Sequence, residues 1–236
     1  MRTVVLVPRR ADGGRRDAIW AWLAKRWADE HPDWELFEGH HDDGPFNRST
    51  AINTASKAAG RWDVAVIADA DSFVGADQID AAVAKAADTG AMVIAYEQYC
   101  YLNKTMSDRI MAGWTGSWWD GVEFSLANTC SNMNVVTRKL WNAVGGFDEG
   151  FEGWGWEDCA FSAACAALGG RERVPDVVWH LWHQPSSENN QDSPEWQAGL
   201  ARLNRYSACE EDLKKTRSLL VELGLKKKPG RAKATS

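Results

Sequence analysis

The sequence predicts an α/β domain with a largely parallel central sheet. Apolar runs of strand length alternate with amphipathic segments of helix length along most of the chain. The 236 residues are 44% hydrophobic and 25% charged, which is ordinary for a globular protein and excludes general disorder. No apolar run approaches the ~18 residues of a membrane span. The first ten residues, MRTVVLVPRR, do not have the pattern of a secretory signal.

The alternation of strands and helices is clearest in the N-terminal half. Residues 3–8 (TVVLVP) are a β-branched run that ends at Pro8, which predicts a buried first strand. Residues 15–30 place apolar side chains at helical spacing, from Ile19 to Trp27, and predict an amphipathic helix. The elements expected next are a strand at 34–38, a helix at 47–59, a strand at 62–71, a helix at 76–88 and a strand at 91–96.

The C-terminal half is less regular. Between residues 97 and 135 the periodicity is weak, so we expect irregular, substrate-facing loops around one or two strands. The elements expected after them are a helix at 137–144, a small-residue helix at 157–168, a last strand at 172–179 and a helix over 193–221. We therefore divide the chain into an α/β domain at 1–190, a helical extension at 191–225 and a disordered basic tail at 226–236.

Charge and cysteine content narrow the class of protein. The net charge is −6, and the last eleven residues contribute +5, which leaves −11 (−6 minus 5) on the rest of the chain. A body this acidic is a poor nucleic-acid surface, so we expect no sequence-specific nucleic-acid binding. Five widely spaced cysteines without a Cys-x-x-Cys pair argue against a disulfide framework or a zinc site, and favour a reducing cytosol.

Two carboxylates follow the apolar run VAVIA, in the stretch Asp69-Ala70-Asp71. Ligands of open α/β sheets bind in the crevice at the carboxyl ends of the strands. One of the two aspartates can hold a divalent cation while the other reaches a sugar hydroxyl, since carboxylate oxygens are preferred ligands of hard cations. The alternative is a pair of acids that ends the strand and caps the next helix.

A second candidate is the segment GGFDEGFEGWGWEDCAF, residues 145–161. Glu157 and Asp158 begin a predicted helix, where a carboxylate is favoured by the helix dipole, and we expect both to face a cleft. The glycines before them permit close approach of a ligand, and Trp154 and Trp156 can form a stacking wall for a sugar. Simple helix capping explains the acids but not the aromatic loop before them.

Histidines and arginines follow other predicted strands. His180 and His183 lie just after the last strand, and a neutral imidazole is a good metal ligand, so one of them can complete a site begun by Asp71. His40 and His41 are weaker candidates, which we place in a solvent-facing loop.

Basic and amide side chains also lie near strand ends and on the second helix. Arginine at the edge of a cleft suits a diphosphate, which it binds in bidentate fashion. A surface salt bridge is the alternative for each arginine taken singly. The side chains in question are Arg9, Arg10, Arg48 and Asn53.

Together these segments resemble the GT-A-fold nucleotide-sugar glycosyltransferases of the family-2-like type. The likeness is greatest to β-1,4-galactosyltransferases and to bacterial chondroitin-polymerase-type transferases, and it covers residues 1–190. The segments that carry it are VPRR (7–10), FNRSTAIN (46–53), ADAD (68–71), GGFDEGFEGWGWED (145–158) and HLWHQPSSEN (180–189).

The resemblance implies a donor site. Pro8, Arg9 and Arg48 match positions that hold the nucleotide and its diphosphate, and Asp69 matches the aspartate near the ribose. We add Trp154 to this set as the stacking wall beside the donor sugar. The segment CSNMNVV (130–136) departs from the Gly-Gly pair that many relatives have there, which leaves the donor sugar open.

The resemblance also implies a metal site and an acceptor site. Asp71 matches the metal-binding aspartate of the family. His183 matches the metal-binding histidine, with His180 as the alternative. Glu157 matches the acceptor-binding acid and Asp158 the catalytic base.

The expected activity is a metal-dependent, inverting hexosyl transfer from a UDP-linked sugar to an acceptor hydroxyl, with Mn²⁺ or Mg²⁺ as the cofactor. The acceptor could be a carbohydrate, a lipid-linked sugar, a protein or modified DNA. A retaining transferase and a catalytically silent carbohydrate-binding protein are the alternatives. A phosphatase of the haloacid dehalogenase type is disfavoured, because Phe73 stands where that motif has Thr or Val. We expect the cytosol of a bacterium or of a phage-infected cell.

Overall fold

The computed structural model of the chain describes residues 1–153, 155–185, 191–209 and 212–227. Among these residues, six strands form the larger sheet in the order β2-β1-β3-β8-β5-β9. Three of its five strand pairs are parallel, and β8 runs antiparallel to both of its neighbours. The strands are β1 (Thr3–Pro8), β2 (Glu35–Gly39), β3 (Val64–Ala68), β5 (Met92–Ile94), β8 (Met133–Thr137) and β9 (Arg171–Arg173). The predicted α/β class with a mostly parallel sheet is confirmed.

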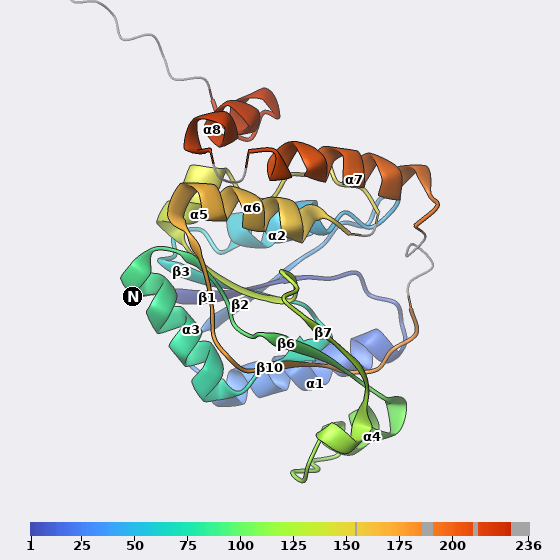
Figure 1. Cartoon of the computed structure of the whole chain (residues 1–236). Coiled ribbons are helices and arrows are strands. Elements are labelled where there is room, and N and C mark those ends of the chain that lie inside the picture. The colour runs from blue at the N-terminus through green and yellow to red at the C-terminus, as the bar shows by residue number, and fades with distance from the viewer. Residues whose placement is uncertain (154, 186–190, 210–211, 228–236) are drawn as a thin grey trace, which may run out of the picture.

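Helices cover both faces of this sheet (Figure 1). α2 and α6 lie above it in that view, and α1 and α3 lie below. Because both faces are covered, β1 and β3 are buried along their whole length, which is why they are continuous apolar runs rather than alternating ones. The helices are α1 (Arg15–Glu30), α2 (Arg48–Ala58), α3 (Ala76–Thr89), α5 (Arg138–Val144) and α6 (Glu157–Gly169).

A smaller sheet of the described chain has the order β4-β10-β6-β7. β10 pairs with β4 in antiparallel and with β6 in parallel orientation, and β7 forms the antiparallel edge. The strands are β4 (Ser72–Phe73), β6 (Gln98–Leu102), β7 (Val122–Ala127) and β10 (Val177–His180). β4 follows β3 after only three residues, so this sheet begins where the larger sheet presents its carboxyl-end crevice.

The strands expected between residues 97 and 135 are present, but the rest of this stretch is more regular than expected. β6, the helix α4 (Lys104–Met111), a 3₁₀ turn (Trp119–Gly121), β7 and the start of β8 occupy most of this stretch. Asn103 caps α4, since its side chain accepts a hydrogen bond from the Met106 amide at 2.8 Å.

Two C-terminal boundaries also differ from the expectation. The last strand is two strands, β9 and β10, which belong to different sheets. The helix expected over 193–221 is α7 (Pro194–Ser207) and α8 (Leu213–Glu222).

Helix α7 is joined to the body of the protein by a buried acid. Asp148, only 7% exposed, accepts two hydrogen bonds from Arg202, each at 2.7 Å, and one from the Tyr206 hydroxyl at 2.8 Å. α7 also packs along α6 (Figure 1).

The residues expected to form the basic tail are described only as far as 227. Of the helices in the described ranges, none has both the length and the hydropathy that crossing a bilayer requires.

Candidate metal centre and carboxylate cluster

Asp71, His180 and His183 come together at the junction of the two sheets. One ligand atom from each residue lies within 4.8 Å of the other two. The Asp71 Oδ2 atom is 3.0 Å from His183 Nε2 and 3.7 Å from His180 Nε2. The sequence left open which histidine accompanies Asp71, and the structure places both beside it.

Backbone pairing produces this convergence over 112 residues of sequence. His180 is in register with Ser72 across the β4–β10 pair, and the Leu181 amide donates to the Asp71 carbonyl at 2.9 Å. The position of the site is therefore set by strand pairing, whose geometry is rigid, rather than by the side chains alone.

The chemistry of this triad fits a divalent transition metal. Burial alone would raise the pKa of Asp71, but the two imidazoles bring that pKa well below its ordinary value. Burial also opposes the charge on His183, yet its hydrogen bond to Asp71 raises its pKa. His183 Nδ1 lies 2.8 Å from the Gln184 carbonyl, which directs Nε2 toward Asp71, and His180 Nδ1 is buried without a hydrogen-bond partner. One carboxylate and two oriented imidazoles are a typical metal-ligand set.

A cluster of three carboxylates around Arg48 lies beside the triad. Arg48 donates from Nε and Nη2 to Asp69 Oδ1, at 3.0 and 2.6 Å. Its Nη1 is 2.5 Å from Asp158 Oδ1 and 3.4 Å from Glu157 Oε1. Asp69 and Asp71 therefore contact different partners, although only one residue separates them.

The acids of helix α6 are buried, which corrects the expectation that they face an open cleft. Glu157 is 7% exposed and Asp158 is 8% exposed. Burial raises the pKa of Asp158 well above its ordinary value, against the opposing charge of Arg48, and the nearby Glu157 and Asp69 add to the rise. Burial likewise raises the pKa of Asp69, again opposed by Arg48.

Comparison with known proteins identifies the fold. The sequence matches no family model and no curated protein. The fold matches the catalytic domain of Drosophila β1,4-galactosyltransferase 7 with xylobiose, at a TM-score of 0.54 and 15% identity over 84% of this chain and 79% of that one. It matches S. aureus TarS with UDP-GlcNAc at a TM-score of 0.56 and 12% identity, over 94% of this chain and 71% of that one. It matches GalNAc-T7 with UDP, GalNAc and Mn²⁺ at a TM-score of 0.52 and 11% identity, over 95% of this chain and 54% of that one.

The chain has the GT-A fold. At these identities the likeness extends to the fold and no further. What the site of this GT-A protein does must be argued from its own residues.

Of the remaining predicted donor residues, some lie at strand ends of the GT-A fold and one is held in ion pairs. Pro8 and Asp69 leave the neighbouring strands β1 and β3 at the same edge, since Leu6 and Ile67 are in register two residues earlier. Arg9 is held by Asp17 at 2.5 Å and Glu38 at 2.8 Å.

The other residues that the sequence singled out have partners outside the triad and the Arg48 cluster, or lie outside the described residues. Trp154 lies outside the described residues. Trp156 caps α6 and meets Trp196 edge-on, with ring centroids 4.9 Å apart. Arg10 donates to the carbonyls of His41 and Gly44, and so holds the loop before α2.

A row of rings beside the triad was missed by the sequence analysis. His180, Tyr101 and Phe124 are in register across β10, β6 and β7. The ring centroids of His180 and Tyr101 are 4.6 Å apart, and Tyr101 and Phe124 stack at 4.1 Å with an interplanar angle of 20°. Phe124 is 50% exposed. The alternation of Tyr99 and Tyr101 in QYCYL is the sequence signal that could have indicated this strand face.

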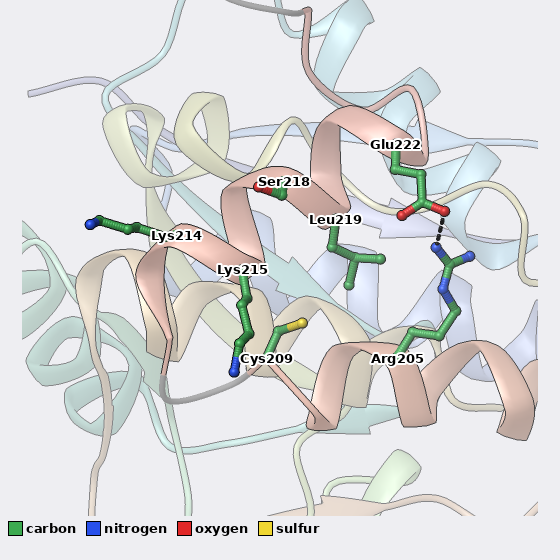
Figure 2. Close-up of a pocket in the computed structure, with 7 residues that line it drawn as sticks. All are labelled: Arg205, Cys209, Lys214, Lys215, Ser218, Leu219 and Glu222. Atoms are coloured by element: carbon green, nitrogen blue, oxygen red, sulfur yellow. Dashed lines mark ion pairs between the residues drawn. The ribbon is translucent and has the colours of Figure 1, made fainter.

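A separate hollow lies between α7 and α8 (Figure 2). Its volume is about 380 Å³, and it is lined by Arg205, Cys209, Lys214, Lys215, Ser218, Leu219 and Glu222. Arg205 is paired with Glu222 at 2.8 Å and Lys215 with Asp212 at 3.4 Å, while Lys214 points away from the other side chains. It shares no residue with the triad or the Arg48 cluster, so we assign no role in sugar transfer to it.

Proposed function

We propose that this protein is a metal-dependent glycosyltransferase that moves a hexosyl group from a UDP-linked sugar to an acceptor hydroxyl. The observation that carries the proposal is the convergence of a metal-ligand triad and a buried carboxylate cluster at one edge of a GT-A sheet. A variant of the Drosophila enzyme is complexed with manganese, UDP-Gal and xylobiose, and GalNAc-T7 with UDP and Mn²⁺, which supports a UDP donor and manganese here. The transfer site belongs to residues 1–190, with 191–225 as an extension and 226–236 as a tail.

Asp71, His183 and His180 would hold Mn²⁺ or Mg²⁺. Such a cation offsets the charge that develops on a leaving diphosphate. Pro8, Arg9 and Asp69 lie at or beside the sheet edge where the nucleotide would bind, and Trp154 would stack on the sugar. Arg48, which the resemblance placed in this set, contacts Asp69 and Asp158 instead.

Asp158 would act as the general base. A hydroxyl is a poor nucleophile, so a carboxylate within hydrogen-bond reach must take its proton as it attacks the anomeric carbon. Glu157 would orient the acceptor. One base and one in-line attack invert the anomeric configuration, which favours an inverting over a retaining mechanism.

The acceptor would lie along the row formed by His180, Tyr101 and Phe124. A sugar ring presents apolar C–H groups on one face, and a flat aromatic ring complements that face. Because the row begins at the triad and ends at a half-exposed ring, an acceptor saccharide on Phe124 would point toward the donor site. This favours a carbohydrate acceptor over a protein, a lipid-linked sugar or modified DNA.

A donor screen tests the proposal. Purified protein with Mn²⁺ would be incubated with a panel of UDP- and other nucleotide-linked sugars and with mono- and disaccharide acceptors, and free nucleotide diphosphate would be measured. We expect release with one UDP-sugar, loss of release in chelator and restoration by manganese. NMR of the product would show the inverted anomer.

Two outcomes would contradict the proposal. Binding of saccharides without release of nucleotide diphosphate would support the silent carbohydrate-binding protein. A product with the donor's own anomeric configuration would support a retaining transferase.

A further inference from the structure

The guanidinium of Arg48 is held by three carboxylates inside the protein. Its Nε and Nη2 groups donate to Asp69, and its Nη1 donates to Asp158 and approaches Glu157. An arginine carries five N–H donors in a fixed fork, and four of them are accounted for by these contacts. A donor diphosphate could bind Arg48 in bidentate fashion only by displacing a carboxylate that is itself buried, and leaving a buried carboxylate without its cation is strongly unfavourable.

The backbone that carries Arg48 is fixed relative to helix α6. Arg48 is the first residue of α2, which Asn47 caps by accepting from the Thr50 amide at 2.9 Å. Asn47 also donates to the Glu149 carbonyl at 2.8 Å. Asn53, one and a half turns along α2, exchanges two hydrogen bonds with the backbone of Phe147, each at 2.9 Å. Side-chain amides thus hold α2 to the segment that leads into α6, and the guanidinium carbon of Arg48 lies 6.0 Å from the Phe147 ring centroid.

Arg48 favours the ionised form of Asp158 against the acidic groups around it. Asp69 faces it from the end of β3, Glu157 and Cys159 from α6 itself, and Tyr96 from the segment after β5. These groups are acidic, and in the parts of the chain that the structure describes, Arg48 is the cation that contacts Asp158. Burial raises the pKa of Asp158 and Arg48 opposes that rise. A base must be ionised before it can accept a proton.

We propose that Arg48 is a positioning residue for Asp158, holding the carboxylate in place as a charged acceptor, and that it is not a ligand of the donor diphosphate. The role of Asp158 as the base rests on the proposed function. The contacts of Arg48 do not.

The test uses Arg48→Gln, Arg48→Lys and the control Arg26→Gln. Arg26 is a partly buried arginine that pairs with Glu30 on α1, outside the site. With Arg48→Gln we expect kcat to fall by about 10²-fold, within the range that a general base contributes. The acidic limb of the kcat–pH profile should move to higher pH, because removing a cation beside a buried acid favours the protonated form. The Kd for UDP with Mn²⁺, measured by calorimetry, should change by less than about twofold.

The lysine variant separates charge from geometry. Arg48→Lys retains the positive charge, so its acidic limb should lie between those of wild type and Arg48→Gln, and it also serves if the glutamine variant does not fold. Arg26→Gln should match wild type in its kcat–pH profile and in its Kd for UDP with Mn²⁺. A UDP affinity that falls tenfold or more in Arg48→Gln, with an unchanged acidic limb, would make Arg48 a diphosphate ligand and overturn the inference.

A measurement without turnover keeps this result distinct from the proposed function. In protein labelled with ¹³C at the aspartate carboxyl carbon, the resonance absent from Asp158→Asn reports the titration of Asp158. Its midpoint should be higher in Arg48→Gln than in wild type. An unchanged midpoint would refute the inference even if sugar transfer is observed, and a raised midpoint would uphold it even if no transfer is found.

Discussion

The two acids in the stretch Asp69-Ala70-Asp71 have different partners. Asp71 meets two imidazoles, whereas Asp69 meets Arg48. Burial acts on both, yet the pKa of Asp71 is lowered and that of Asp69 is raised, because the cationic partners of Asp71 outweigh its burial. The local surroundings of each carboxylate, rather than the residue type, decide which can hold a metal.

The proposed role of Asp158 as the general base is tested by Asp158→Asn. The amide preserves the shape of the side chain but cannot accept the proton, so kcat should fall by about 10²–10⁴-fold. The Kd for UDP with Mn²⁺ should be unchanged. The control is Asp77→Asn, which changes an exposed acid in the first turn of α3. Wild-type turnover in Asp158→Asn would remove Asp158 from the role of base.

Residue identity alone predicted part of this site. The Asp-x-Asp stretch was expected at a strand end and the two acids at a helix start, and the structure places both there, joined through Arg48. The sequence could not choose between His180 and His183, because their directions depend on the pairing of β10 with β4. Nor could it indicate that Asp158 is buried, since that depends on Arg48, 110 residues away.

At the scale of elements, strands and helices with uninterrupted periodicity were predicted to within a few residues. β3 and α3 are examples, because their burial patterns are simple. The bounds of β6 and β7 were not predicted, and α4 was not expected. β7 is exposed along nearly its whole length, so it lacks the apolar pattern that would distinguish it from a loop. Such an edge strand contributes to the candidate site through one side chain that the register aligns.

The role of β7 is tested by Phe124→Ala. The loss of a stacking face worth about 0.5–1.5 kcal/mol should raise KM for the acceptor found in the screen by about two- to twelvefold, with the Kd for UDP unchanged. Leu213→Ala, which shortens an exposed apolar side chain on α8, should leave both constants at wild-type values. An acceptor KM that does not change in Phe124→Ala would place the acceptor elsewhere.

At the scale of the whole molecule, the metal triad connects the two sheets. A ligand that binds only the folded state raises its stability, by about 2.7 kcal/mol at a hundred times Kd. For a chain of this length that corresponds to about 5–10 °C in Tm. We therefore expect Mn²⁺ to raise Tm by this amount in calorimetry.

His183→Ala supplies the comparison for the manganese measurement. It removes one ligand of the triad, so manganese should leave its Tm nearly unchanged. An equal rise in the variant would show that manganese binds elsewhere on this acidic protein.

The separation of the triad along the sequence has a consequence for biosynthesis. A ribosome delivers Asp71 long before His180 and His183, and the intervening residues include β5, β6, β8 and α6. A nascent chain that stops short of β10 has one ligand and no rigid place for a cation. Manganese loading would therefore be a late event, after most of the larger sheet has emerged and paired, and a ribosome-stalled fragment ending before residue 180 should fail to retain the ion.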